Sequence, residues 1–474
     1  MSVIVAIDAA ISGYNSTGRV AAAVLLADGD VFASAHDVLR GGVMSSVDCS
    51  GISFLTSLGN AFCLRCEALS TIDLAHMTHL TYVGHSFLSG CTQLTALDLP
   101  DSILRLGDGF LKGCTSLPTM DLGPLSSVTE MGNEFLAYCS SLSTLSLTPL
   151  TRLTSVGASF LYGCSGLLSL DHAGAAVRFN IGKTFLGCCR GLATVDLTPL
   201  SRATVVSDFF LAGCPTLVAV DLSPLSRCTA VGNLFLSGCS GLTTLTLCAF
   251  SNVTRLGHLF LSYCVGLSSL DLAPLGRVTR LGNMFLTGCT RLQTLNFTAL
   301  SQLECLGSSF LSHCTSLSEL NLRSLHNVTV IRDSFLCGCT GLAALQLPPQ
   351  ISSVGHQFLA RCKKLSIIDL SALGCCGYIG NLFLTECSPR GVALAVMLLP
   401  PAPGSISQSA VVAETTLSQG PASQISTPRR VPAPLGSAQR RDTSGPRSSV
   451  TRHSQRSCKP APSTNRTPSD KRSK

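Results

Sequence analysis

The sequence contains no tryptophan, and charged residues make up only 12% of its 474 residues. Its longest apolar stretch, Val392–Leu399, is far shorter than the roughly 18 residues needed to cross a membrane. Met1–Ala10 lacks the basic flank of a secretory signal and carries Asp8. These absences predict a cytoplasmic protein without a transmembrane segment.

Catalytic signatures are also missing from the chain. We find no GxSxG elbow, P-loop, HExxH pair or kinase signature. Catalysis needs side chains that converge on one point, whereas a repeat spreads equivalent side chains along a line. The sequence therefore predicts a non-enzymatic protein with no catalytic residues, cofactor or metal site. An enzymatic function in residues 1–40 would need an associated subunit, because so short a segment hardly forms an independent fold.

A 25-residue repeat dominates what the sequence does contain. Cysteines recur at this spacing without a slip at Cys189, Cys214, Cys239, Cys264, Cys289 and Cys314. A fixed period of roughly 20–50 residues indicates a solenoid, in which each unit covers the hydrophobic face of the next. With each cysteine counted as position 0, fourteen units run from Gly41 to Glu386. The units that start at Cys91 and Cys339 have 23 residues instead of 25.

Each unit has the apolar pattern of a short strand followed by further segments. Leucine or a similar residue occupies positions 3, 6 and 8, and positions 6 and 8 alternate with 5 and 7, as in a half-buried strand. Apolar residues return at positions 11, 14 and 17, before Gly at 18 and Phe-Leu at 21 and 22. We expect a strand, a turn, a second short extended segment and a helical turn that carries Phe-Leu. The glycine is expected at a tight corner with positive φ.

The LxxLxL strands with a downstream GxxFLxxC resemble leucine-rich repeats of the Treponema or BspA-like class, which carry an IGxxAFxxC pattern. Similar runs of cysteine-containing units are familiar in trypanosomatid and other protist leucine-rich-repeat proteins. Over about residues 41–399, the resemblance implies an α/β repeat solenoid. This would be a horseshoe with a parallel β-sheet on the concave face and short extended or helical turns on the convex side. It also implies a scaffold that binds proteins, and it assigns no catalytic residues.

The two end segments do not follow the repeat. Residues 1–40 are expected to cap the solenoid, with a hairpin over Ala22–Ala33, or to be the remnant of a small separate β-rich domain. Residues 400–474 are rich in Ser, Pro, Thr and Arg and are expected to be disordered. This tail holds 12 Lys or Arg and 3 Asp or Glu, a net charge of +9. Because the whole chain carries +7, residues 1–400 carry −2.

Fourteen of the 24 cysteines occupy position 0, from Cys66 to Cys387. Disulfide frameworks are typical of short secreted chains, so we expect a column of small buried thiols instead. Cys63 and Cys66 form a lone CxxC pair without a second pair at zinc-binding spacing. This pair is only a weak indication of a metal site.

The candidate protein-binding face is the outward side of the strand at positions 5–7. Position 7 carries aspartate in nine of the fourteen units, most prominently Asp73, Asp98, Asp121, Asp171, Asp196, Asp221 and Asp271. Neighbouring parallel strands lie about 4.8 Å apart, so these carboxylates would form an acidic row on a concave face for a basic ligand. Alternatively, they are solubilising residues satisfied locally by nearby Ser and Thr. On this assignment Leu270→Ala costs about 2–5 kcal/mol, whereas Asp271→Ala is near neutral.

Other features give weaker indications. Position 13 carries arginines that are expected along a solvated edge: Arg152, Arg202, Arg227 and Arg277. Another position carries His85, His258 and His356, in units too remote from one another to bind a metal together. The unit at Cys164 departs from the pattern at His172 and Gly174, as sequence drift or as a kink or contact site.

The function predicted from these patterns is that of a monomeric protein-interaction scaffold with an unidentified protein partner. The alternative is a binder of nucleic acid or an anionic membrane surface through the tail. The candidate anion-binding residues of the tail are Arg429, Arg430, Arg440, Arg441, Lys471 and Arg472.

Overall fold

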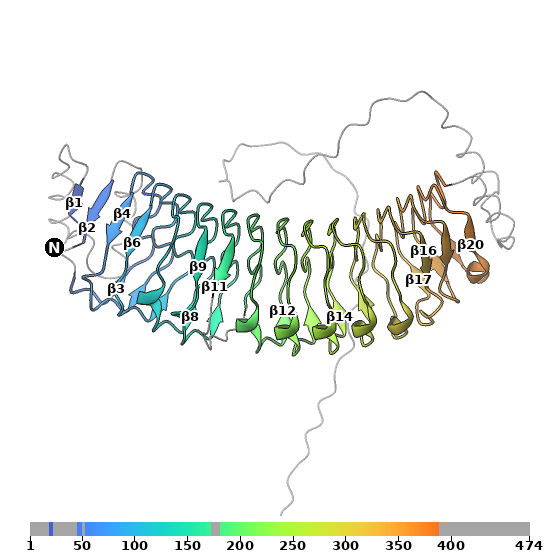
Figure 1. The fold of residues 1–474 in the computed structure, drawn as a ribbon, viewed down its shortest axis with the longest axis horizontal. Helices are drawn as coiled ribbons and strands as arrows, with labels where there is room; N and C mark the ends of the chain where they lie inside the picture. Colours follow the sequence, from blue (N-terminus) through green and yellow to red (C-terminus); the bar gives the residue numbers. More distant parts are fainter. Residues whose placement is uncertain (1–18, 22–44, 50–52, 172–180, 388–474) are drawn as a thin grey trace, which may run out of the picture. The chain divides into compact units, whose positions relative to one another are not determined.

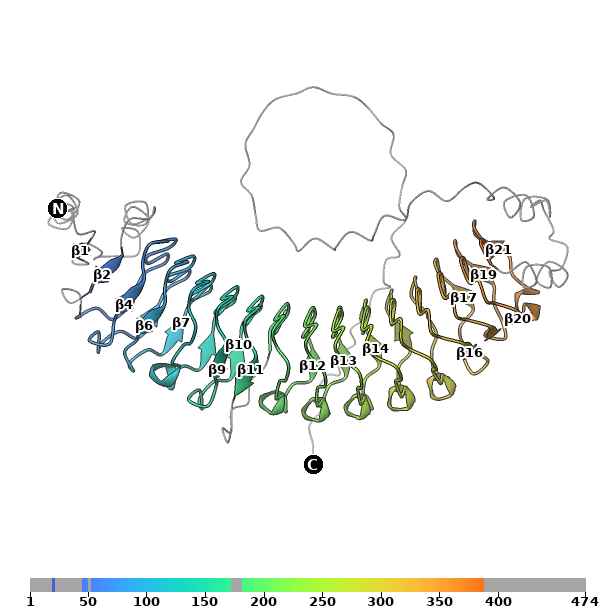
Figure 2. The same ribbon diagram turned by 45° about the horizontal axis from the view of Figure 1, so that its top comes forward.

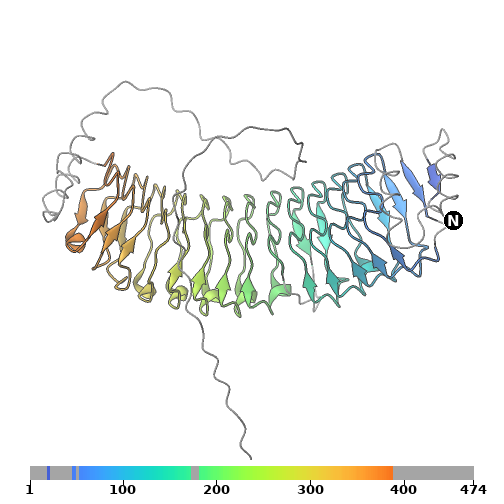
Figure 3. The same ribbon diagram turned by 180° about the vertical axis from the view of Figure 1, so that it is seen from behind.

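The computed structural model describes residues 19–21, 45–49, 53–171 and 181–387. The chain divides into two compact units, residues 1–418 and 419–474, and all described residues belong to the first. In this unit each repeat forms one coil, and the coils stack side by side (Figures 1 and 3). The strands pair in parallel with the equivalent strands of neighbouring coils. The predicted leucine-rich-repeat solenoid is therefore confirmed.

The first strand of a coil covers positions 5–7, and its middle residue is buried. In the strand Thr71–Asp73, Ile72 is buried between two exposed residues, as a period of two requires when one face packs on a core. The first strands are β2 (Ser46–Asp48), β4 (Thr71–Asp73), β6 (Ala96–Asp98), β9 (Thr144–Ser146), β11 (Ser169–Asp171), β16 (Glu319–Asn321), β18 (Ala344–Gln346) and β20 (Ile367–Asp369). Before them, β1 (Arg19–Ala21) pairs in parallel with β2.

The second strand covers positions 16 and 17 in the 25-residue coils, which confirms the expected second extended segment. Position 17 is the buried one, as in Arg255–Leu256. The second strands are β3 (Ser57–Leu58), β5 (Tyr82–Val83), β7 (Arg105–Leu106), β8 (Glu130–Met131), β10 (Ser155–Val156), β12 (Val205–Val206), β13 (Ala230–Val231), β14 (Arg255–Leu256), β15 (Arg280–Leu281), β17 (Val330–Ile331), β19 (Ser353–Val354) and β21 (Tyr378–Ile379).

A short 3₁₀ turn joins the two strands in many coils, at positions 9–11. Proline at the second residue of the turn, as in Ser223-Pro224-Leu225, fixes φ near the value that such a turn needs. The 3₁₀ turns are η3 (Gly123–Leu125), η4 (Thr198–Leu200), η5 (Ser223–Leu225), η6 (Cys248–Phe250), η7 (Ala273–Leu275), η8 (Thr298–Leu300) and η9 (Ser371–Leu373).

The Phe-Leu segment does not form the expected helical turn. Positions 20, 22 and 24 adopt left-handed φ instead, as at Leu234 (56°), Leu236 (51°) and Gly238 (77°). In a helix their NH groups would bond within the coil. Here the Leu234 NH donates to His258 O of the next coil at 2.7 Å, and the Leu236 NH donates to Phe210 O of the preceding coil at 3.0 Å. These bonds between coils offset the strain that left-handed φ imposes on leucine.

The glycine at position 18 is needed for space, and the positive φ expected for it is wrong. Gly257 lies outside the left-handed region, but a Cβ on it would stand 2.4 Å from the carbonyl carbon of Gly232 in the preceding coil. Atoms this close cannot coexist. Glycine therefore allows the two backbones to approach and the Gly257 NH to donate to Val231 O at 2.9 Å.

Two columns of stacked side chains run through the core, among the buried leucines of the other positions. The phenylalanines of position 21 stack from Phe62 to Phe383, with ring centroids 5.0–5.9 Å apart and interplanar angles of 6–13°. The Phe160–Phe185 contact, at 5.7 Å, continues this column past residues 172–180. The cysteines of position 0 form the second column. All but Cys387 at its end are buried, as predicted.

The stacked coils follow an arc, and the two kinds of strand lie on opposite sides of it. In Figure 2, β10, β17 and β21 run along the inner side of the arc, and β9, β16 and β20 run along the outer side. On the inner side of an arc, neighbouring strands lie closer together than on the outer side, so strand pairing is easier to keep on the inner side. The middle coils agree with this, because their second strands β12–β15 remain paired although these coils form no first strand.

Several predictions fall outside the described residues. These are the hairpin over Ala22–Ala33, the irregular stretch with His172 and Gly174, and the basic tail over residues 400–474 with Arg429, Arg430, Arg440, Arg441, Lys471 and Arg472.

Candidate protein-binding surface

The aspartates of position 7 are exposed on the solvent side of the first strands, as the period of two predicts. Strands β4 and β6 pair in register, so Asp73 lies beside Asp98. Asp73, Asp98 and Asp121 occupy successive coils, and so do Asp171, Asp196 and Asp221, whereas Asp271 has no aspartate beside it. The structure thus brings six of the seven predicted residues together as two short rows.

Each row also has a local role in the fold. Asp271 Oδ1 accepts a hydrogen bond from the NH of Ala273, two residues further on, at 2.9 Å. Asp73, Asp121, Asp196 and Asp221 make the same contact at 2.8–2.9 Å. Such an Asx turn fixes the backbone where the strand ends and the 3₁₀ turn begins.

Within the described residues, Asp98 makes no such contact with the residue two positions further on, and its sequence explains why. Two residues after Asp98 stands Pro100, which has no NH to donate. Elsewhere in the row, Asn296 and Asn321 replace aspartate and accept the same bond from the NH two residues on, at 2.9 and 3.0 Å. The near-neutral effect expected for Asp271→Ala therefore needs correction, because the substitution removes a hydrogen bond.

The expected concave placement of the aspartates also needs correction. Asp73, Asp98 and Asp171 belong to first strands, which follow the outer side of the arc in Figure 2. The equivalent position in coils without a first strand holds Asp121, Asp196, Asp221 and Asp271. This outer surface is shallow, because small Thr, Ser or Ala residues occupy position 5 in most of its coils.

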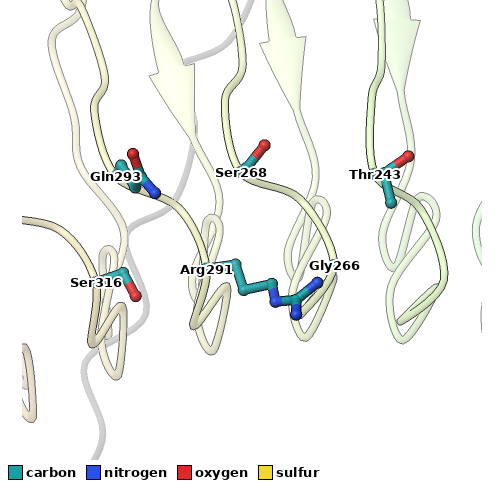
Figure 4. A pocket seen from close by; sticks show the side chains of 6 residues that line it. All are labelled: Thr243, Gly266, Ser268, Arg291, Gln293 and Ser316. Carbon is teal, nitrogen blue, oxygen red and sulfur yellow. The ribbon is translucent and has the colours of Figure 1, made fainter.

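An open hollow of about 340 Å³ lies on the same surface. It is lined by Thr243, Gly266, Ser268, Arg291, Gln293 and Ser316. Figure 4 shows the Arg291 side chain extended across the hollow towards Gly266 of the preceding coil. Its lining offers hydrogen-bond donors and acceptors but no carboxylate, thiol or imidazole, so it can bind polar groups and has no general acid or base.

Position 19 forms a ladder that sequence reasoning did not find. The Asn233 NH donates to Asp208 Oδ1, the His258 NH to Asn233 Oδ1, and the Asn283 NH to His258 Nδ1, at 2.8–2.9 Å. The same bonds link Asn60, His85, Asp108, Asn133 and Ala158. The available signal was the frequent choice of Asn, Asp or His at this position, since each places an acceptor atom at the same distance along the side chain.

This ladder explains the recurrent histidines. His85, His258 and His356 each accept an NH from the next coil through Nδ1, at 2.9–3.0 Å, and each lies in a separate part of the stack. Within the described residues, no group of three or more His, Cys, Asp or Glu side chains is placed to hold a metal ion. The ring nitrogens therefore serve the fold.

The cysteine column is protected by burial. Cys289 Sγ donates to Leu261 O at 3.1 Å, and burial raises the pKa of this thiol to about 12. Cys63 of the CxxC pair is fully buried; its hydrogen bond with Cys66, together with burial, raises its thiol pKa. Such thiols stay protonated and are poor nucleophiles and ligands.

The arginines of position 13 are exposed, as expected. Arg277 donates to Asn252 Oδ1 of the preceding coil at 3.2 Å. Two further arginines, Arg255 and Arg280, occupy position 16 on the inner side of the arc, where sequence analysis had assigned no row. Arginines therefore gather in the second halves of the middle coils.

The comparisons with known proteins agree with this architecture. The family model described as the BspA-type leucine-rich repeat region, present in six copies, matches residues 56–178, 179–287 and 267–389. No curated protein matches the chain. Within the described ranges, no helix is long and apolar enough to span a membrane.

Solved structures similar to this chain include bacterial leucine-rich-repeat proteins. One from Bacteroides ovatus is 18% identical, with 70% of this chain and 77% of that chain covered and a TM-score of 0.46. One from Eubacterium ventriosum is 17% identical, with 77% and 86% covered and a TM-score of 0.44. The leucine-rich-repeat protein of T. pallidum is 23% identical, with 36% and 78% covered and a TM-score of 0.31.

Proposed function

Because the chain belongs to the BspA-type leucine-rich-repeat family, we propose that it is a non-enzymatic protein-interaction scaffold whose solenoid binds partner proteins. Leucine-rich-repeat proteins are in general interaction scaffolds, and such solenoids offer extended surfaces for binding. The observation that supports this function most is the continuity of the stack. Equivalent side chains repeat along both of its faces over residues 53–171 and 181–387.

The chemistry of the described residues favours binding over catalysis. The cysteine column is buried, and the aspartates and histidines of the ladders form hydrogen bonds with the backbone. The open hollow beside Arg291 contains no acid–base pair. We propose further that the scaffold acts as a monomer in the cytoplasm, and that residues 1–40 cap its first coil.

A second candidate function is supported by the charge of the tail. Residues 401–474 carry +9, and such segments attract nucleic acid or anionic membranes. No aromatic residue is interleaved with the basic ones, so the tail lacks a platform for base stacking. The absence of aromatic residues favours the scaffold function over nucleic-acid binding by the tail.

Proximity labelling in the native cell tests the two functions against each other. The full chain is compared with a variant that ends at Pro400. The scaffold function predicts that the principal protein partners are labelled by both and that they bind the purified full chain directly. Loss of all partners on truncation would transfer the function to the tail, and turnover of a substrate by the purified chain would overturn the non-enzymatic assignment.

A further inference from the structure

Two arginines lie side by side on the inner side of the arc. Strands β14 and β15 pair in parallel with Arg255 opposite Arg280, so their Cα atoms are about 4.8 Å apart across the ladder. Like charges directly opposite each other on a sheet destabilise it. This arrangement costs the fold free energy unless an anion neutralises it.

The surrounding residues supply little negative charge. Arg255, Arg202 and Arg227 form no ion pair with any described residue. Arg280 has only a 3.9 Å contact with Glu304, in which the two side chains are 65% and 57% exposed. Asp208, at the same side of the stack, is already engaged by Lys183 at 3.2 Å. The second halves of these coils therefore present five arginines, including Arg277, to solvent.

Other parts of the same row are balanced. Strands β7 and β8 pair with Leu106 opposite Met131, which places Arg105 beside Glu130, an opposite charge. Towards the end of the stack, position 16 is uncharged at Val330. Exposed arginines at positions 13 and 16 thus recur in the four successive coils that start at Cys189, Cys214, Cys239 and Cys264.

We propose that this surface, the arginine face (Arg202, Arg227, Arg255, Arg277 and Arg280), binds an acidic, extended segment of a partner protein. The proposal rests on the scaffold function and names the chemistry of its partner. Arginine binds carboxylates through two parallel hydrogen bonds. The arginines occupy four successive coils, about 19 Å at about 4.8 Å each, which an extended segment of about six residues spans.

A protein segment fits this face better than a nucleic acid does. The exposed neighbours of the arginines on the second strands are Thr204, Thr229, Thr254, Val205 and the half-buried Ala230. None of them has an aromatic ring on which a base could stack, whereas single-stranded nucleic acids depend on such stacking. Threonine and small apolar side chains suit an extended peptide backbone.

The test measures binding of a fluorescent acidic peptide to the full-length chain by anisotropy. The peptide alternates Glu with Thr over about six residues, the length expected to match the face. The variant Arg255→Glu/Arg280→Glu is compared with Arg190→Glu/Lys364→Glu. Both pairs are exposed, both variants change the net charge by the same amount, and both keep the tail. The control pair lies at positions 1 and 2, outside the arginine face.

We expect the arginine-face variant to bind the peptide at least about tenfold more weakly than the unchanged chain, and the control variant to lose less than about twofold. Binding of the peptide to the unchanged chain should weaken at high salt. Arg255→Gln/Arg280→Gln, which removes the repulsion, should bind weakly and remain folded by circular dichroism. Equal loss in both charge-reversed variants, or no loss, overturns the proposal, as does tighter binding of an oligouridylate of equal charge. If the variant fails to bind peptide but retains its cellular partners, the acidic-segment proposal is wrong and the scaffold function stands.

Discussion

Replacing Gly257 by alanine tests whether the close approach of neighbouring coils stabilises the solenoid. The added Cβ would stand 2.4 Å from the carbonyl carbon of Gly232 and 2.5 Å from its oxygen. Ordinary contacts need about 3.4 Å or more, so the two backbones must separate by about 1 Å. The Gly257 NH···Val231 O bond, now 2.9 Å long, would then exceed the range of a hydrogen bond.

The magnitude follows from this single lost bond. A buried NH left without a partner costs about 1–3 kcal/mol, and we expect Gly257→Ala to reduce the free energy of unfolding by that amount. The chain supplies its own precedent at position 18. There Ser207 replaces glycine, its NH has no such backbone partner among the described residues, and its hydroxyl donates to Ile181 O at 3.4 Å. The variant should therefore fold with a weakened junction between two coils.

Urea unfolding and amide hydrogen exchange measure this effect. Exchange should accelerate at Gly257 and Leu259 more than in distant coils, because repeats couple chiefly to their neighbours. Gly276→Ala is the matched control, since Gly276 has right-handed φ and ψ of −59° and −17° and should change stability by less than about 1 kcal/mol. Equal urea midpoints for the two variants would refute the argument from close approach.

Three other predictions concern the ladders and the core. Leu270→Ala should reduce the free energy of unfolding by about 2–5 kcal/mol because it empties a buried site. Asp271→Ala should reduce it by about 1 kcal/mol because it removes the acceptor for the Ala273 NH. Thermal melts in which Asp271→Ala is the less stable variant would contradict the assignment of Leu270 to the inside and Asp271 to the outside. Asn233→Ala should cost about 1 kcal/mol, whereas Asn233→Asp should retain stability, since it keeps the acceptor for His258; equal urea midpoints would exclude the ladder. Cys289, with its pKa raised from 9.0 to about 12, should resist a thiol reagent at pH 8 until the chain unfolds, while the exposed Cys248 reacts at once. Such thiols ionise first in the unfolded chain, so their contribution to stability should be constant below about pH 9 and fall between about pH 9 and 12. A flat alkaline profile would contradict their burial.

The alternation along the strands could be predicted because a period of two needs no knowledge of the neighbouring coils. It placed Leu270 inside and Asp271 outside correctly, and the recurrence of cysteine predicted a buried column. The juxtaposition of Arg255 and Arg280 was also available in principle. Coils of 25 residues in register bring together any two residues 25 apart.

The remaining features depend on contacts between coils that local propensity does not report. Leucine is a poor choice for left-handed φ, so nothing in the Phe-Leu pattern predicts the conformation of Leu234 and Leu236. Bonds to the coils before and after stabilise that turn. The side on which the arc is concave depends on the relative spacing of the two sheets, and the sequence pattern of one unit does not define it.

The position-19 ladder has a consequence for how such a chain can change in length. Most coils offer their successor the same kind of acceptor at position 19, although Ala158, Lys183 and Ser308 interrupt the series, and Asn, Asp and His serve alike. A coil can therefore follow a predecessor other than its own without losing this bond. Unequal exchange between nearly identical 25-residue units would add or remove whole turns in frame, with the backbone joints already compatible. A protein of this kind can adjust the extent of its surface by duplication before any single side chain is refined for a new partner.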